Sequence, residues 1–328
     1  MPVAHQPLIP SVRSLLDPQY VSFHDQVLQY LPVLNTLPPP GPRPAGNLLP
    51  GSSAVRQVDK VEEFDLCGGR FRVRAFSPKG TAPVNGWPAL LWFHGGGWVW
   101  GSLDSENHIA SRMTDELECV SVACEYRKAP EDPFPAAVED AIDALKWLAT
   151  EGKSILSVDD GRIAVGGCSA GGNLAAVVSL HAHELSIKLC QQVLLVPVVD
   201  NTLDETSEFW KPRVNVPWLP PSKMLWYRKV YMPNSQTWSH PDASPILADD
   251  DVLRTSPPTF VGVAEQDLLC FEGQAYAQKL KDLGVKVECK VYKGCTHQLP
   301  SLDGIMDKGK ILLDDVTHTL RQAFNRQS

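Results

Sequence analysis

Apolar and polar positions divide most of this chain into short apolar runs and longer stretches with helical spacing. The apolar runs predict strands near residues 89–93, 119–125, 162–166, 192–197, 259–264 and 286–292. Between them, the recurrence of apolar positions predicts helices near residues 104–118, 135–150, 171–184, 270–283 and 303–324. Such an alternation of strands and helices is typical of an α/β fold with a mostly parallel sheet.

Ahead of these strands, two shorter runs alternate between apolar and polar residues. They are Val61–Leu66 and Phe71–Ser77, and the pair Gly68-Gly69 between them favours a tight turn. The pattern predicts an antiparallel hairpin at one edge of the sheet. With this hairpin the sheet has about eight strands.

The N-terminal segment departs from the strand–helix alternation. Residues 11–36 carry apolar positions at helical spacing. The run Pro38-Pro39-Pro40-Gly41-Pro42 ends any helix and favours a stiff, extended connector. We expect residues 1–45 to form the N-terminal part of a helical cap.

A second segment, residues 200–240, also interrupts the alternation and is rich in tryptophan and proline. Ser222–Tyr231 within it has helical character, and we expect the segment to complete the cap over the sheet. The remaining residues, 46–199 and 241–328, then form the core. The tryptophans of residues 200–240 either line a rigid apolar pocket or simply hold the segment in place, and the pattern fits both interpretations.

Composition excludes one class of partner. The 328 residues are 43% hydrophobic, which is ample for one large core, and the formal net charge is −8 at pH 7. Phosphate binding depends on clustered lysine and arginine, and no basic stripe is present. We therefore expect no nucleic-acid partner.

The eight cysteines include no C-x-x-C pair, and several fall in apolar strand positions. We interpret them as free thiols in a reducing compartment, and expect a cytoplasmic monomer or homodimer without stable membrane insertion. Cys168 is interpreted either as an oxidation or alkylation site or as a buried, inert thiol.

Gly167-Cys168-Ser169-Ala170-Gly171 lies between a predicted strand and a predicted helix. This is the context of the G-x-S-x-G elbow, in which a strained turn exposes the serine hydroxyl. Taken alone, the pattern also fits an ordinary turn that contains a serine. Three further features favour Ser169 as a nucleophile.

The first feature is the glycine run in His94-Gly95-Gly96-Gly97-Trp98, which directly follows a strand. Bare glycine N–H groups can approach a developing oxyanion, and losing one such donor typically costs about 3 to 4 kcal/mol of barrier. We assign the N–H groups of Gly95, Gly96 and Ala170 to an oxyanion hole. His94 is expected to brace the loop, and a glycine run alone also fits a flexible loop.

The second and third features are an acid and a base. Asp267 follows the strand near 259–264, and His297 follows the next strand. The order serine, aspartate, histidine along the chain differs from the trypsin-like and subtilisin-like orders. Glu265 is the alternative acid.

These residues carry a resemblance to a known family. From Ala89 to Leu299 the chain resembles the hormone-sensitive-lipase-like branch of α/β-hydrolases. The segments that match are His94–Trp98, Tyr126–Glu131, Pro133–Ala137, Gly167–Gly172, Ala243–Pro245, Asp267 and His297. The resemblance implies an α/β-hydrolase fold with a helical cap. It also implies a serine carboxylesterase with Ser169 as nucleophile, Asp267 as acid and His297 as base.

Three departures from the family pattern concern the surroundings of the site. Cys168 stands where many relatives have aspartate or threonine, and Lys128 stands where many have leucine. The stretch after the acid reads Asp267-Leu268-Leu269-Cys270-Phe271, where relatives have Asp-Pro-Leu-Arg-Asp. None of these changes removes a member of the triad or an oxyanion donor.

We therefore expect hydrolysis of short- to medium-chain, small-molecule carboxylic esters through an acyl-enzyme, with no metal and no organic cofactor. Trp98, Trp210 and Trp218 are the expected pocket residues. The alternatives are a dehydratase or an acyltransferase on the same fold, and a non-catalytic receptor for a small ligand. Resemblance to the receptor relatives would imply a lost catalytic histidine, whereas His297 is present.

Overall fold

The computed structural model describes residues 3–36 and 50–325, and within them eight strands form a single sheet. The strands are β1 Lys60–Leu66, β2 Phe71–Ser77, β3 Trp87–Phe93, β4 Val120–Glu125, β5 Val158–Cys168, β6 Leu189–Leu195, β7 Thr259–Gln266 and β8 Val287–Thr296. Their order in the sheet is β1-β2-β4-β3-β5-β6-β7-β8. β1 and β2 form an antiparallel hairpin at one edge, β2 is antiparallel to β4, and all other pairings are parallel. The α/β-hydrolase fold expected from the sequence is confirmed.

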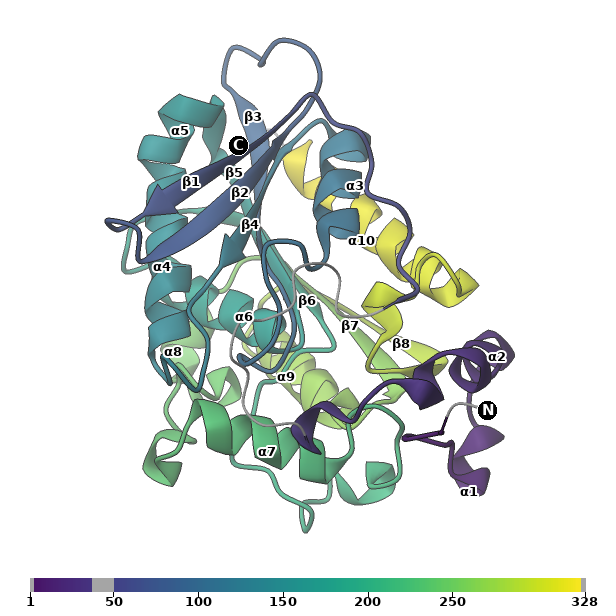
Figure 1. The fold of residues 1–328 in the computed structure, drawn as a ribbon. Helices are drawn as coiled ribbons and strands as arrows, with labels where there is room; N and C mark the ends of the chain where they lie inside the picture. The colour runs from purple at the N-terminus through teal and green to yellow at the C-terminus, as the bar shows by residue number, and fades with distance from the viewer. Residues whose placement is uncertain (1–2, 37–49, 326–328) are drawn as a thin grey trace.

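Helices cover both faces of this sheet (Figure 1). They are α3 Asn107–Leu117, α4 Ala136–Ala149, α5 Glu151–Leu156, α6 Ala170–Ala182, α9 Cys270–Asp282 and α10 Asp307–Phe324. Buried side chains of α3 and α10 share one apolar cluster with one face of the sheet. Those of α4, α6 and α9 share a second cluster with the opposite face.

Strand β3 shows how sequence and layers correspond. Leu90 and Trp92 belong to the α3/α10 layer, whereas Leu91 and Phe93 belong to the α4/α6/α9 layer. Successive side chains of a strand point to opposite faces, so a strand buried on both sides is apolar at every position. This is why the run was recognisable as a strand, and its end delivers the glycine loop to the carboxyl edge of the sheet.

The N-terminal segment is more broken than its periodicity predicts. Its described part contains α1 Pro10–Arg13, α2 Pro18–Gln26, and the 3-10 turns η1 Leu28–Tyr30 and η2 Leu34–Thr36. Pro18 lacks an N–H and begins a new helix, while the Asp17 side chain accepts the N–H of Gln19. The predicted proline-rich connector, residues 38–42, lies outside the described residues.

The second interrupting segment contains η3 Lys211–Arg213, α7 Pro221–Tyr231 and η4 Ser235–Thr237, so the helix expected at Ser222–Tyr231 is present. In Figure 1 the purple N-terminal segment lies against α7, and η2 contacts that helix. The remaining short elements are η5 Pro245–Leu247, α8 Asp250–Leu253 and η6 Leu299–Ser301. We call residues 3–36 and 200–240 the cap.

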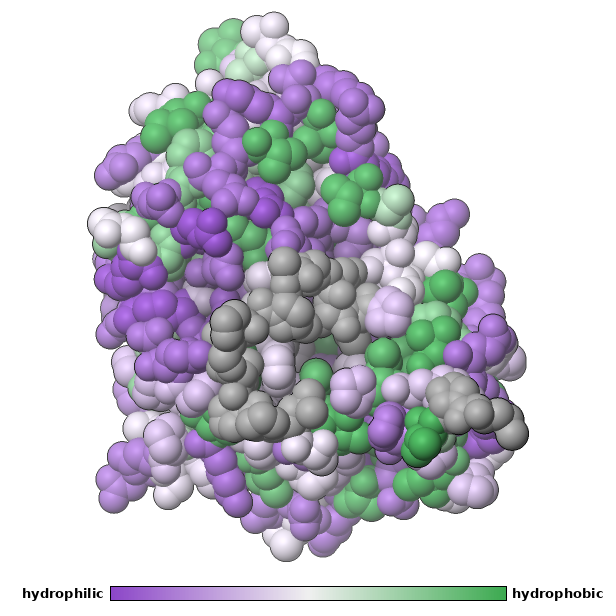
Figure 2. All heavy atoms as spheres, viewed as in Figure 1, coloured by the Kyte–Doolittle hydropathy of each residue, from purple (hydrophilic) through white to green (hydrophobic). Residues whose placement is uncertain are grey.

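The hydropathy of the surface differs between the hairpin β1–β2 and the cap. Figure 2 shows hydrophilic residues dominating the area over β1 and β2, and a mixture of hydrophobic and hydrophilic residues over the N-terminal segment and α7. Among the described residues, no helix has both the length and the apolar character needed to span a bilayer.

The close approach of β3 to α6 predicts the effect of a small substitution. A Cβ atom at Gly171 would overlap the backbone carbonyl of Phe93, which cannot move without shifting β3. We expect Gly171→Ala to lower the free energy of unfolding by about 3 kcal/mol, measured by urea denaturation. In the control Gly161→Ala, the nearest atom to the new Cβ is the Asp159 side-chain oxygen at 3.2 Å. Equal stability of the two variants would contradict the proposed clash.

Candidate active site

Ser169 occupies a sharp turn between β5 and α6. Its φ of +56° and ψ of −116° are rare for a residue with a side chain, and such strain is typical of functional turns. The turn is held by the Ser169 N–H, which donates to the carbonyl of Leu195 on β6 at 2.8 Å. The neighbouring strand therefore fixes the direction of the serine side chain.

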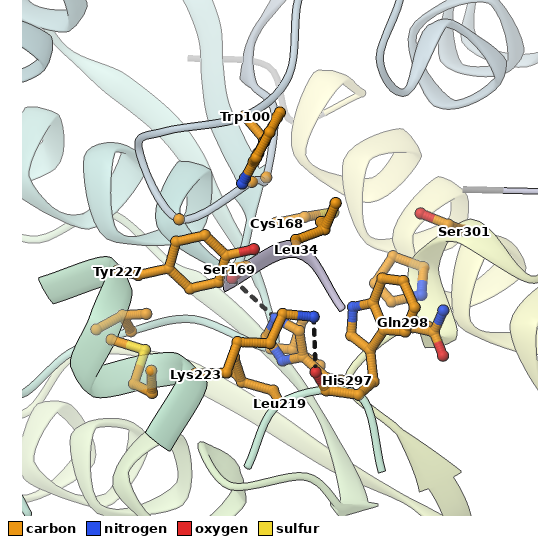
Figure 3. A pocket seen from close by; sticks show the side chains of 18 of the residues that line it. Leu34, Trp100, Cys168, Ser169, Leu219, Lys223, Tyr227, His297, Gln298 and Ser301 are labelled. Carbon is orange, nitrogen blue, oxygen red and sulfur yellow. Dashed lines mark hydrogen bonds between the residues drawn. The ribbon is translucent and has the colours of Figure 1, made fainter. Parts of the chain in front are cut away.

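Three side chains from the carboxyl ends of different strands meet at this turn. The His297 Nε2 atom lies 2.9 Å from Ser169 Oγ, and its Nδ1 atom lies 2.8 Å from Asp267 Oδ2. The side chain of Asp267 is fully buried and that of His297 is 10% exposed. In Figure 3 a dashed line joins Ser169 to the His297 ring, and the Lys223 side chain of α7 reaches across beside that ring. Because Asp267 accepts at Nδ1–H, Nε2 is free to accept the serine proton.

The alternative acid has a different partner. Glu265 Oε2 accepts the backbone N–H of Gly294 at 2.8 Å, near the end of β8. Asp267 Oδ1 accepts the N–H of Leu269 at 3.3 Å, which orients its second oxygen toward the imidazole. The structure thus brings Asp267, and not Glu265, to the histidine.

The glycine loop lies beside the elbow, but one expected donor is already engaged. The N–H of Gly95 donates to Glu106 Oε1 at 2.9 Å, so it is directed away from a substrate oxygen. Gly96 and Gly97 have φ values of +124° and +62°, and a Cβ on either would overlap Trp100 or Tyr227. Glycine is therefore required at both positions. Gly96 and Gly97 come directly after Gly95 in the chain and, like it, line the cavity.

Ala170 is the first residue of α6, a position whose N–H has no partner within the helix. The sequence-based assignment of Gly95, Gly96 and Ala170 therefore needs one correction, because Gly95 donates to Glu106 instead.

Comparison with known proteins places this geometry in a family. A family model described as "alpha/beta hydrolase fold" matches residues 90–301, which is more than half of the chain. The chain belongs to the α/β-hydrolase family.

Relatives define the branch of this hydrolase. An AB hydrolase superfamily protein of Schizosaccharomyces pombe is 41% identical over 97% of each chain. An ethyl acetate hydrolase of Pseudomonas putida is 33% identical, covering 81% of this chain and 84% of the relative. The solved structure of a hyperthermophilic esterase from Pyrobaculum calidifontis superimposes with a TM-score of 0.75 at 34% identity, covering 81% of this chain and 84% of that one. The expected membership in the hormone-sensitive-lipase-like branch is confirmed, and the protein is a carboxylic ester hydrolase.

Glu106 is a residue of the hydrolase site that sequence reasoning missed. It precedes α3 with a φ of +61°, is buried, and accepts the N–H of Gly95 and the indole N–H of Trp92 at 2.7 Å. Burial raises the pKa of its carboxyl, an effect that the two hydrogen bonds oppose. Nothing in the sequence pattern separates this glutamate from an ordinary acid at the start of a helix.

The neighbouring Cys168 thiol is buried beneath the elbow. Burial raises its pKa well above the usual range, and the Glu106 carboxyl raises it further. A protonated thiol is a weak nucleophile, so these surroundings favour the inert interpretation of Cys168.

His94 contacts the glycine loop and Tyr126. Its Nδ1 atom donates to the carbonyl of Gly95 at 2.6 Å, and its ring stacks on Tyr126 with centroids 4.4 Å apart. The Tyr126 hydroxyl donates to the carbonyl of His94 at 2.8 Å. These contacts are those of a brace for the glycine loop.

A cavity of about 90 Å³ opens over Ser169 between the core and the cap. Trp98 and Trp218 line it, whereas Trp210 does not. Trp210 is fully buried and donates its indole N–H to Glu272 Oε2 at 3.0 Å, attaching the cap to α9. Of the three expected pocket tryptophans, Trp210 therefore does not line the cavity. It holds the cap segment in place, which was the other interpretation left open by the sequence.

Because Glu106 holds the glycine loop, removing its carboxylate is expected to slow catalysis through the position of that loop. In Glu106→Gln an amide replaces the carboxylate that accepts from Gly95 and Trp92, so one N–H of the pair loses its acceptor. We expect kcat for p-nitrophenyl butyrate to fall about tenfold with little change in KM. The control Glu118→Gln alters an exposed glutamate with φ of +49° at the other end of α3. A matching loss in both variants, or a change confined to KM, would contradict a role in positioning the glycine loop.

Proposed function

We propose that this carboxylic ester hydrolase acts on short- to medium-chain esters through an acyl-enzyme formed on Ser169. The observation that carries the proposal is the imidazole of His297, which contacts both the Ser169 hydroxyl and the buried Asp267 carboxylate. This arrangement can activate a hydroxyl at neutral pH without any other group.

In the first step, Ser169 Oγ attacks the ester carbonyl and its proton passes to His297 Nε2. The carbonyl π electrons move to the oxygen, which becomes an oxyanion. Asp267 stabilises the imidazolium formed at this point and fixes the tautomer from which it forms.

The oxyanion is held by backbone N–H groups. We assign this role to Gly96, Gly97 and Ala170, with Gly97 in place of Gly95, because Gly95 donates to Glu106. The oxyanion then collapses, the C–O bond to the alcohol breaks, and the alcohol leaves with the proton from His297.

The second step reverses these roles with water. His297 takes a proton from water as the water oxygen attacks the acyl carbon, and a second oxyanion forms in the same place. Its collapse breaks the bond to Ser169 Oγ, which recovers the proton from His297. The products are a carboxylic acid and an alcohol.

Two observations support a preference for short chains. The cavity that contains Ser169 is small, about 90 Å³. The relative from Pseudomonas putida is named for hydrolysis of ethyl acetate, a small ester. The intact Ser169–His297 contact favours hydrolysis over a receptor role, and the named esterase relatives favour it over dehydration or acyl transfer.

The free thiols of the enzyme support one type of cellular compartment. All eight cysteines are free, including five buried in the apolar clusters of the core. Free thiols are typical of reducing compartments, which supports a cytoplasmic location and small-molecule esters found there.

The nucleophile is tested by removing one oxygen atom. Ser169→Ala is expected to abolish hydrolysis of p-nitrophenyl acetate and covalent labelling by a fluorophosphonate, because no other hydroxyl contacts His297 in the described structure. Ser179→Ala is the control, since Ser179 lies buried on the same helix and donates only to the carbonyl of Ala175. Labelling that persists without Ser169 would place the nucleophile elsewhere.

Chain length is tested with a series of p-nitrophenyl esters. We expect kcat/KM to be highest for acetate to hexanoate and to fall at least tenfold by palmitate, because a long acyl chain exceeds the cavity. A rate that rises steadily toward palmitate would show that the cap opens far beyond the volume described above.

A further inference from the structure

Lys223 is a buried amine in the wall of the cavity that contains Ser169. It is the third residue of α7, its exposed fraction is 2%, and it lines the cavity together with His297. Its Nζ atom donates to the carbonyl of Trp218 at 2.9 Å and lies 4.1 Å from the centroid of the Trp218 ring. Figure 3 shows the amine beside the His297 ring, on the cavity side of α7.

This amine has no acidic partner among the described residues. Among residues 3–36 and 50–325, no carboxylate lies within ion-pair distance of Nζ. Burial of an unpaired ammonium is costly, and it lowers the pKa of Lys223 to about 7. The location in the first turn of α7 adds to the cost, because the positive end of a helix dipole disfavours a cation.

The rest of the cavity wall also presents donors in excess. The indole N–H groups of Trp98 and Trp100 are buried and have no acceptor among the described residues. The one carboxyl of the wall, Glu106, already accepts two N–H groups. An ammonium has three N–H bonds, and the Trp218 carbonyl takes one of them. The described cavity wall therefore offers no uncommitted carboxylate to the Lys223 amine, and a substrate can supply one.

We propose that Lys223 binds an anionic group of the substrate, so that the preferred ester carries a carboxylate a few bonds from the scissile carbonyl. A monoester of a short dicarboxylic acid has this chemistry. The small cavity sets the spacing, because Ser169 and Lys223 line the same space of about 90 Å³. The proposal rests on the esterase function of Ser169 and names the substrate class for that site.

The test compares two esters of nearly equal shape, monoethyl succinate and ethyl 4-methylpentanoate, by release of ethanol. The first carries a carboxylate where the second carries an isopropyl group. Wild-type enzyme is expected to have the higher kcat/KM for monoethyl succinate. Lys223→Met keeps the length of the side chain and removes the charge, and is expected to lower the ratio of the two kcat/KM values about 10- to 100-fold. The rate for the neutral ester is expected to change less than threefold.

Lys229→Met is the matched control, because Lys229 lies on the same helix with its side chain exposed. This variant is expected to leave the ratio unchanged. A ratio that is also unchanged in Lys223→Met, or a wild-type preference for the neutral ester, would overturn the proposal. Equal losses for both esters in Lys223→Met would assign Lys223 to holding the Trp218 loop.

The ratio also depends on pH with a defined sign. The ammonium form of Lys223 is present below its pKa, so the preference for the anionic ester is expected to decrease as pH rises from 6 to 9. Other titratable groups line the cavity or the space on the far side of Lys223, namely His297, Glu106, Cys168, Tyr227 and His24. Titration that affects both esters alike cancels in the ratio, and the Lys223→Met ratio should not vary with pH.

Stability provides a readout independent of turnover. Between pH 7 and 10 the unfolded chain holds a proton on Lys223 that the folded protein has released, so folding becomes more favourable as pH rises. This part of the pH dependence is expected to disappear in Lys223→Met, which should also be the more stable protein at pH 7.

Recognition and catalysis are separated by calorimetry with the Ser169→Ala protein. Monoethyl succinate is expected to bind this protein at least tenfold more tightly than it binds the Ser169→Ala/Lys223→Met protein. If neither ester is hydrolysed by wild type but this difference persists, the esterase proposal fails and anion recognition stands. If both esters are hydrolysed and the difference is absent, only the role of Lys223 fails.

Discussion

The site depends on one close contact of backbone with backbone, between the end of β3 and the start of α6. Any side chain at Gly171 would overlap the carbonyl of Phe93, and any side chain at Gly167 would overlap Gly171. These glycines let the strand that carries the loop donors lie directly against the turn that carries Ser169. The hydroxyl and the N–H groups of Gly96 and Gly97 thus share one wall because two main chains meet without side chains between them.

The parts of this arrangement that were predictable are those with a local signature. Strand β3 is buried on both faces and so appears as a continuous apolar run, and the elbow is marked by its flanking glycines. Asp267 and His297 each follow an apolar strand, and parallel strands deliver their carboxyl ends to one edge of a sheet. Periodicity and chain order indicated these positions, Glu265 remained the alternative acid, and the family resemblance supported Asp267 and His297.

The parts that escaped prediction depend on contacts between distant residues. The engagement of Gly95 by Glu106 requires the start of α3 to fold back onto the glycine loop, and no pattern near residue 106 indicates it. Trp210 and Trp218 looked equivalent, yet one is bonded to α9 and the other lines the cavity. In the N-terminal segment, apolar spacing predicted a helix where Pro18 divides the chain into shorter pieces.

The anchoring of Trp210 has a consequence for how this enzyme can diversify. Near one end of the cap segment, the Trp210 indole N–H donates to Glu272 of α9, and toward the other end the carbonyl of Tyr231 accepts the N–H of Phe134 in the core at 2.9 Å. The stretch between these two anchors supplies Trp218 and Lys223, while Ser169, Asp267 and His297 come from the sheet. Substitutions in the stretch can therefore retune which molecules are accepted while the hydrolytic machinery stays intact, so selection can act on preference and on chemistry separately.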